Sequence, residues 1–282
     1  MTIRKHIEYC EKVLDDGGIE AYAFEAKEIV AFALGTRANR LWAIIDTDAP
    51  EGIDQKIMDC LAKRTHGEPL QYILGEWEFY SLPFKVGTGV LIPRADTEII
   101  VDKALEELKG KRDARVADLC SGSGCIAISI AKNCPDCNVD AYELSEDAIK
   151  FLKANNELNG TNVNIIQGDI LKADCAQKYD IILSNPPYIR TAEIDTLEEE
   201  VSHEPTMALD GGSDGLDFYR CITEKWINNL NEGGKLMVEI GYDQADEVKH
   251  LFQAAGLTDI QAVKDLGGNH RVIIGTLPYK TT

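Results

Sequence analysis

The sequence has 282 residues, of which 44% are hydrophobic and 27% charged, and its formal net charge is −19. It contains no apolar run near the ~20 residues that a membrane-spanning helix needs and no apolar signal core at its start, so we expect a cytoplasmic protein without membrane contact. We also expect the protein to be a monomer. Stable nucleic-acid binding depends on Lys and Arg neutralising phosphates, and the acidic balance argues against it.

Residues 1–75 are predicted to form a small all-α domain. Apolar residues recur there at helical spacing, and Gly67 and Pro69 then break the pattern. The predicted helices cover Ile3–Leu14, Ala26–Ala33, Leu41–Ile45 and Ile53–Arg64. This region carries no pattern with catalytic chemistry, so we interpret it as a helical bundle, with recognition of a substrate protein as a hypothesis.

Residues 76–92 are predicted to form a β-hairpin linker. Trp77, Phe79, Phe84 and Val86 have period-two spacing around a turn that contains Pro83. Alternation of this kind on both sides of a turn is typical of a hairpin.

Residues 93–282 are predicted to form a doubly wound α/β domain, because helical patterns alternate there with apolar strands. The strands are expected at Arg115–Leu119, Asn138–Tyr142, Val163–Ile166, Asp180–Ser184, Lys235–Ile240, Asp259–Val263 and Arg271–Thr276. The helices are expected at Thr97–Leu108, Ile126–Lys132, after the N-cap Ser145, at Phe218–Leu230 and at Gln244–Ala255. The last two strands have no helix between them and should pair antiparallel.

Two of the eight cysteines, Cys134 and Cys137, have the spacing of a metal-ligand pair. No second cysteine pair or histidine pair accompanies them, so we favour a surface turn over a zinc or redox site and predict no bound metal.

A glycine-rich turn follows the first predicted strand and opens a helix. Its residues Cys120, Ser121, Gly122, Ser123 and Gly124 form a G-x-G pattern without the third glycine of the pyrophosphate fingerprint. This absence favours S-adenosylmethionine over a nicotinamide dinucleotide. Asp118 ends the strand, where its carboxylate can face the cationic methionine end of that cofactor.

Carboxylates also end the next two strands. Glu143 lies 21 residues after Gly122, a spacing that suits hydrogen bonds from ribose hydroxyls, although a solvated strand-end acid is the alternative. Asp169 could accept from an adenine amino group while Ile170 packs on the ring. Because the carboxyl ends of parallel strands meet at one sheet edge, these residues are expected to form one cofactor site.

The tetrapeptide Asn185-Pro186-Pro187-Tyr188 follows the fourth predicted strand. An amide nitrogen is a poor nucleophile, so a site must hold its NH2 group by acceptors and aim it at the methyl donor. The Asn185 side-chain oxygen and the backbone carbonyl of Pro186 can accept its two N–H bonds, and Tyr188 can lie over the planar group. The motif therefore predicts methyl transfer by orientation, with a plain Asn-Pro turn as the alternative.

At this point the chain resembles the release factor glutamine methyltransferases, the PrmC/HemK family. The matching pieces are Pro69–Gly75, Leu91–Glu98, Asp118–Ile126, Asn185–Tyr188, His203–Pro205, Asp210–Gly212 and Asp214–Leu216. The resemblance implies a seven-stranded class I methyltransferase sheet after the helical domain and hairpin. It also implies methylation of the glutamine in the Gly-Gly-Gln loop of class I peptide chain release factors, at side-chain N5. By motif position, Cys120 to Gly124, Glu143, Ile170 and Asn185 would line the cofactor, and Asn185 to Tyr188 would hold the glutamine.

The sequence departs from the family pattern at Ala95, where proline is frequent, and at Cys120, where glycine is common. Three other functions remain open. A nucleic-acid N-methyltransferase acting on adenine or guanine shares the Asn-Pro-Pro-Tyr motif. A nicotinamide-dependent oxidoreductase would need the third glycine, and a non-catalytic binding module would use the same fold without turnover.

Overall fold

The computed structural model describes residues 1–173 and 175–280, and they divide into two compact units. One unit comprises Met1–Gly75 together with Glu198–His203, and the other comprises Glu76–Leu197 and Glu204–Thr282. No helix in the described part of the chain is long and apolar enough to cross a membrane.

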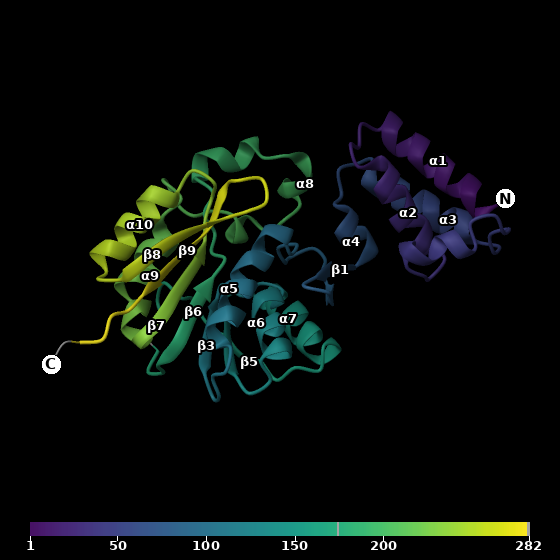
Figure 1. The fold of residues 1–282 in the computed structure, drawn as a ribbon. Helices are drawn as coiled ribbons and strands as arrows, with labels where there is room; N and C mark the ends of the chain where they lie inside the picture. The colour runs from purple at the N-terminus through teal and green to yellow at the C-terminus, as the bar shows by residue number, and fades with distance from the viewer. Residues whose placement is uncertain (174, 281–282) are drawn as a thin grey trace. The chain divides into compact units, whose positions relative to one another are not determined.

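The first unit is built from helices (Figure 1), with one isolated β-bridge between Thr2 and Asp48. Its elements are α1 (Ile3–Asp16), α2 (Tyr22–Ala33), a 3-10 helix (Ala38–Ala43), α3 (Ile53–Arg64), α4 (Leu70–Leu74) and α8 (Glu199–Ser202). The apolar stripe of α1 is buried, as its helical spacing predicted. The expected helix at Leu41–Ile45 is wrong in type and position, because a 3-10 turn ends at Ala43.

A buried arginine joins α8 to this unit. Arg64 ends α3 and donates to both carboxylate oxygens of Glu25, over 2.6 and 3.1 Å, and it also pairs with Glu200. Arg64 and Glu25 are both buried, so each charge needs the other. The segment Glu198–His203 is therefore held by the helical unit although it lies more than 120 residues further along the chain.

The second unit begins with a hairpin of β1 (Glu76–Phe79) and β2 (Leu82–Lys85). The predicted hairpin is present, but residues 86–92 form no strand. Asn155, fully buried on α7 (Glu146–Leu158), accepts from the Lys85 amide over 2.6 Å and donates to its carbonyl over 3.1 Å. The same side chain donates to the Ser123 carbonyl over 3.0 Å, so it connects the hairpin to the glycine-rich turn.

The sheet of the second unit has seven strands in the order β5-β4-β3-β6-β7-β9-β8. Neighbours pair in parallel from β5 to β7, and β9 pairs antiparallel with both β7 and β8. The antiparallel pairing of β8 with β9 was predicted from the sequence. The strands are β3 (Arg115–Leu119), β4 (Asn138–Glu143), β5 (Asn164–Gln167), β6 (Tyr179–Ser184), β7 (Leu230–Glu239), β8 (Thr258–Lys264) and β9 (His270–Thr276). The strand order reverses between β3 and β6, and ligands bind at such a switch point.

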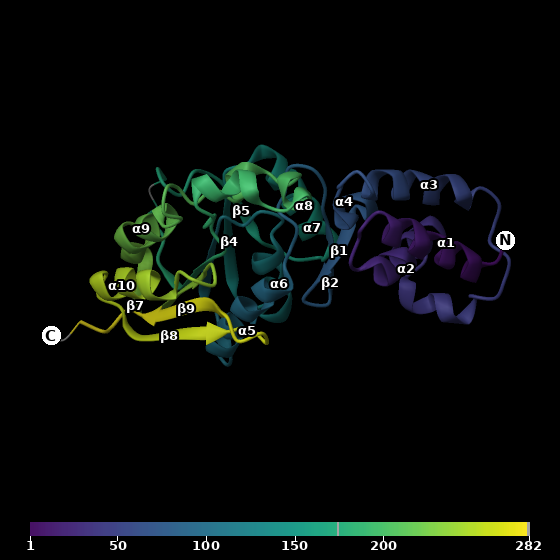
Figure 2. The same ribbon diagram turned by 90° about the horizontal axis from the view of Figure 1, so that it is seen from above.

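Helices cover both faces of the sheet (Figures 1 and 2). On one face lie α5 (Glu98–Leu108), α6 (Cys125–Asn133) and α7 (Glu146–Leu158), and on the other lie α9 (Asp217–Glu224) and α10 (Ala245–Ala254). Successive strand residues alternate between the two cores: Ile181 and Leu183 contribute to the first, and Ile182 to the second. Burial on both faces explains why these strands read as continuous apolar runs.

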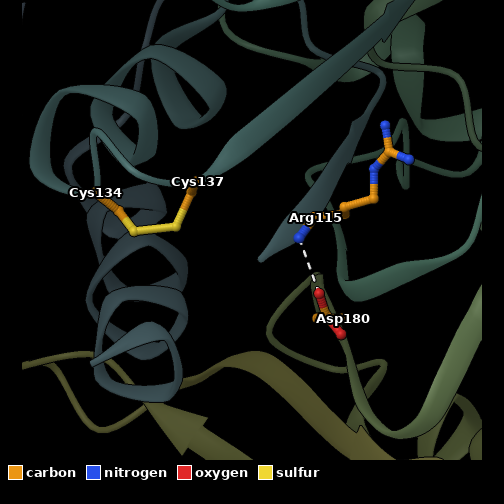
Figure 3. The surroundings of a disulfide bond; sticks show 4 residues. All are labelled: Arg115, Cys134, Cys137 and Asp180. Carbon is orange, nitrogen blue, oxygen red and sulfur yellow. Dashed lines mark hydrogen bonds between the residues drawn. A yellow bond between two sulfur atoms is a disulfide. The ribbon is translucent and has the colours of Figure 1, made fainter. Parts of the chain in front are cut away.

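A disulfide closes the turn between α6 and β4 (Figure 3). The Cys137 amide donates to the Cys134 carbonyl over 2.9 Å, so the predicted turn is present, and the two sulfur atoms are bonded. Spacing alone could not distinguish this bond from a ligand pair. Within residues 1–173 and 175–280, no group of three or more His, Cys, Asp or Glu side chains could hold a metal ion.

Candidate active site

The turn after β3 has an unusual backbone. Cys120, Gly122 and Gly124 all adopt positive φ, at 61°, 55° and 80°. Glycine accepts this conformation without strain, whereas a residue with a Cβ pays about 1 kcal/mol or more. Cys120, which stands where glycine is common in the family, is therefore strained, because its backbone is held in the left-handed region.

Asp118 braces this turn from behind. It is fully buried, and its Oδ2 accepts from Ser121 Oγ over 2.6 Å and from the Ala127 amide over 3.2 Å. Its Oδ1 has no hydrogen-bond partner among the described residues. Asp118 is not in the wall of the cavity, so the structure gives no support to the direct contact with a cofactor cation that the sequence suggested.

A cavity of about 420 Å³ opens at the carboxyl ends of β3, β4, β5 and β6. Its volume lies within the range of small-molecule sites. It brings together most of the residues that the sequence selected, namely Cys120, Ser121, Gly122, Ser123, Glu143, Asp169, Ile170, Asn185 and Pro187. Gly124, Pro186 and Tyr188 are not part of its wall. Its remaining walls include Arg94, Thr97, Pro205, Met207 and Phe218.

Glu143 is not a solvated strand-end acid. It is 9% exposed, and its carboxylate accepts from the backbone amides of Gly122, Leu144 and Ser145 over 2.7, 2.8 and 2.7 Å. These bonds fix the carboxylate at the cavity wall and hold the glycine-rich turn against the end of β4. Each carboxylate oxygen has two acceptor positions, so capacity remains for hydroxyl donors.

Asp169 and Ile170 are fixed by their neighbours. Asp169 accepts from the Leu171 amide over 3.0 Å, and the Lys172 ammonium, 2.9 Å away, lowers the pKa of this carboxyl. The Ile170 carbonyl accepts from the indole nitrogen of Trp226 over 3.0 Å. The apolar Ile170 side chain thus meets the cavity from a rigid backbone.

Asn185 is oriented by a threonine from another element. Its Nδ2 donates to Thr97 Oγ1 over 3.2 Å, and Thr97 is 1% exposed. This bond occupies the NH2 end of the amide and leaves Oδ1 as an acceptor. The sequence predicted Thr97 as the start of a helix, and the hydrogen bond shows that it also orients Asn185.

The backbone after Asn185 is held from two sides. Gln244 Nε2 donates to the Tyr188 carbonyl over 2.9 Å, and the Gly211 amide donates to the Ile189 carbonyl over 2.8 Å. A Cβ at Gly211 would lie 2.7 Å from Tyr188 Cα and 2.8 Å from the Pro187 carbonyl oxygen. The segment that begins at Gly211 therefore packs directly on the backbone of the motif, which explains why Gly211 carries no side chain.

Three residues that hold the site in place were not predicted from the sequence, namely Gln244, Asn155 and Trp226. None of the three lines the cavity. Asn155 left a weak signal, because a polar amide continues the buried face of α7 formed by Ile149 and Leu152. Gln244 precedes α10, and nothing in its local sequence indicates a contact with Tyr188.

The cavity fits S-adenosylmethionine on the chemistry of its walls. Glu143 offers a fixed carboxylate for ribose hydroxyls, and Ile170 an apolar surface for a ring. At Gly122, a Cβ would meet nothing within 4 Å, so the open side of the turn has room for a ligand close to the backbone.

Gly124 is expected to be intolerant of a side chain, and Gly122 provides the matched control. Both have positive φ, so Gly→Ala costs each about 1 kcal/mol of folding free energy. Only at Gly124 would the Cβ also overlap Leu152 and Ile128, at 2.3 and 2.9 Å, which adds roughly 1–3 kcal/mol. Urea unfolding of both variants measures the difference. Equal destabilisation would show that the turn does not need this close approach.

Stability is expected to fall as the pH rises through neutrality. Burial raises the pKa of Asp118 to about 7, above its unfolded value of about 3.9. The folded state therefore binds more protons than the unfolded state between these values, and the stability from that proton is lost as pH rises through about 7. Urea unfolding at about pH 5.5 and 8 should show the loss, and Asp118→Asn should flatten it. An unchanged pH dependence in this variant would contradict the assignment. Some slope should remain, because burial also raises the pKa of Glu239 to about 7.

The chain is similar to known proteins over most of its length. Residues 6–75 match the PrmC N-terminal domain family, and residues 97–213 match the Methyltransferase small domain family. The chain is 41% identical to the release factor glutamine methyltransferase of Geobacter sulfurreducens over 98% of this chain and 97% of that protein. It is 40% identical to the enzyme of the same name from Fusobacterium nucleatum, over 98% of this chain and 78% of that protein.

Among solved structures, a methyltransferase from Pyrococcus furiosus superimposes with a TM-score of 0.54 at 19% identity, covering 71% of this chain and 91% of that one. This likeness concerns the fold, and it agrees with the seven-stranded sheet. Because the two enzymes match over nearly the whole length of this chain, the chain belongs to the release factor glutamine methyltransferases.

Proposed function

We propose that this protein transfers a methyl group from S-adenosylmethionine to side-chain N5 of the glutamine in the Gly-Gly-Gln loop of class I peptide chain release factors. The observation that carries the proposal is the position of Asn185 and Pro187 in the wall of the cavity, with the Asn185 NH2 group already bound to Thr97. The names of the relatives that match over almost the whole chain support the same substrate.

In the proposed reaction, Asn185 Oδ1 accepts one N–H of the glutamine amide and the Pro186 carbonyl accepts the other. The cofactor, when bound, supplies an electrophilic methyl group on a sulfonium. In the transfer, the bonding electrons would remain on the sulfur, which would leave as a neutral thioether, and the amide proton would pass to water. The protein contributes orientation, because the motif is held by Thr97, Gln244 and the Gly211 segment.

We propose that the other walls of the cavity hold the cofactor. Glu143 would accept from ribose hydroxyls, Asp169 from the adenine amino group, and Ile170 would pack on the ring. The turn Cys120–Gly124 would contact the methionine end. Tyr188, whose pKa burial raises to about 12, would lie over the planar amide as a neutral phenol.

Residues 1–75 would recognise the substrate protein, and residues 93–282 would catalyse methyl transfer. Residues 76–92 would link these two domains. The helical unit exposes the apolar side chains of Tyr9, Phe24, Phe32, Trp42 and Met58, and a bound substrate protein would cover some of them. The acidic net charge supports a protein substrate over nucleic acid. We propose that the protein acts as a monomer.

Mass spectrometry of a release factor after incubation with enzyme and cofactor tests the proposal. One added methyl group is expected on the loop glutamine, and none on a release factor whose loop glutamine is replaced by glutamate. Labelled cofactor offered to DNA and RNA in parallel tests the nucleic-acid alternative. Methyl transfer to a base, or to another residue of the release factor, would overturn the proposed substrate.

A further inference from the structure

The disulfide between α6 and β4 closes a very short loop (Figure 3). Only Pro135 and Asp136 separate the two cysteines. A cross-link stabilises a fold mainly by constraining the unfolded chain, and this effect is smallest when the loop is short. The turn is also held by backbone hydrogen bonds, since the Cys137 amide donates to the Cys134 carbonyl and the Asp113 amide to the Asp136 carbonyl. Stabilisation therefore gives little reason for the bond, which the sequence did not predict.

The disulfide is accessible from one side. Cys134 and Cys137 are both half-buried and pack against the core beneath α5, α6 and α7. Cys134 also lies in the wall of a second cavity, of about 610 Å³, whereas Cys137 does not. Exposed disulfides are the ones that exchange most readily with other thiols. A small molecule in this cavity would therefore meet the Cys134 sulfur first.

The second cavity is distinct from the proposed cofactor site. The glycine-rich turn precedes α6 and Cys134 follows it, so the two cavities lie at opposite ends of this helix. They share no wall residue. A ligand in the second cavity would therefore leave the first one open.

The second cavity is basic in a protein whose net charge is −19. Its wall contains the exposed residues Lys109, Lys111 and Arg112 and one acid, Asp136. Within residues 1–173 and 175–280, none of these three cations forms an ion pair. Unpaired cations attract anions and raise their local concentration. They also favour the thiolate form of a thiol, which is the form that attacks a disulfide.

We propose that Cys134 and Cys137 form an exchange site for an anionic low-molecular-weight thiol, a small thiol that carries carboxylates. Its thiolate attacks the Cys134 sulfur, the disulfide breaks, and its electron pair leaves with the Cys137 sulfur, which takes a proton from water. The product is a mixed disulfide at Cys134. A second thiolate attacks the sulfur of the bound small thiol, and Cys134 leaves as a thiolate. The pair is then reduced by two electrons, and the two small thiols leave joined by a disulfide.

Glutathione, which is anionic, and cysteamine, which is cationic, test the charge of the site. Starting from the disulfide form at low salt and equal thiolate concentration, glutathione should open the bond about tenfold faster than cysteamine. About 0.5 M salt should remove most of this preference. Thiol alkylation followed by mass spectrometry of the peptide that contains both cysteines measures the opening. Failure of either small thiol to open the bond, or equal rates for the two, would overturn the proposal.

A triple variant tests whether the wall cations cause this preference. Replacement of Lys109, Lys111 and Arg112 together by glutamine should abolish it. The matched control replaces Lys5, Lys12 and Lys56 by glutamine, because these cations are exposed, lie outside the wall and change the net charge equally. The control should keep the preference of the wild-type protein. A preference that survives in the first variant, or is lost in both, contradicts a local site.

Single-cysteine variants test which sulfur the small thiol reaches. In Cys137→Ser and in Cys134→Ser, the remaining thiolate can displace one thiol from oxidised glutathione. Peptide mapping should find the glutathionyl group on Cys134 of the first variant several-fold faster than on Cys137 of the second. Faster modification of Cys137 would refute the assigned direction of attack. These experiments involve no methyl transfer, so their outcome is independent of the proposed function.

Discussion

Replacement of Asn185 by alanine is expected to lower kcat for glutamine methylation by roughly 10²–10³-fold, because the acceptor that orients the amide nitrogen is lost. The cofactor should still bind, because Glu143, Ile170 and the glycine-rich turn line other parts of the cavity. The variant therefore separates a catalyst from a binding module that uses the same fold.

Single-turnover methylation and calorimetric titration with cofactor measure the two effects of Asn185→Ala separately. Asn228→Ala is a suitable control, because Asn228 is exposed and lies outside the cavity wall. If Asn185→Ala retained kcat, the motif would not act on the reacting amide. Loss of cofactor binding alone would move Asn185 from substrate orientation to cofactor binding.

Gly211→Ala is expected to lower kcat about 10²-fold without contact to either substrate, because a displacement of the motif by a fraction of an ångström misaligns the reacting atoms. The new Cβ would overlap backbone atoms of Pro187 and Tyr188, at 2.7 to 2.9 Å, and backbone cannot rotate away. The motif or the glycine segment must therefore move.

Gly267→Ala is the matched control, since its Cβ would meet only the side chains of Asp265 and Asn269, the nearest atom at 3.2 Å. Thermal unfolding of both variants shows whether they are folded at the assay temperature. A folded Gly211→Ala variant with wild-type kcat would show that the motif tolerates displacement, and orientation would then not explain the rate.

The strands were predictable because both faces of the sheet are buried. Residues such as Ile181, Ile182 and Leu183 must be apolar whichever core they meet, and the resulting runs mark β6 directly. The predicted helix Phe218–Leu230 is wrong at its end. The helix stops at Glu224, a 3-10 turn follows, and Leu230 already begins β7. The local apolar pattern fits both the predicted longer helix and the observed arrangement. Only the pairing of β7 with β6 therefore determines where the helix ends.

The candidate site was predictable where its residues follow strand ends, because topology alone brings those loops to one edge. Glu143, Ile170 and Asn185 belong to this class. The contacts of Thr97 and Gln244 could not be predicted, because each reaches the motif from a distant element. Asp118 ends its strand as predicted, but its carboxylate faces the glycine-rich turn instead of the cavity. Its hydrogen bonds with Ser121 and the Ala127 amide hold it in this orientation.

The membership of Glu198–His203 in the helical unit has a consequence for proteolysis. The chain leaves that unit after Gly75, returns at Glu198 and leaves again after His203. A single cut at the Gly75–Glu76 bond would therefore not release the helical unit as a free fragment, because Glu200 would still pair with Arg64 while remaining covalently attached to the sheet. The two fragments of the nicked protein should stay associated until a second cut falls near residue 198 or 203. Loss of the ion pairs of Arg64 with Glu25 and Glu200 would also separate them.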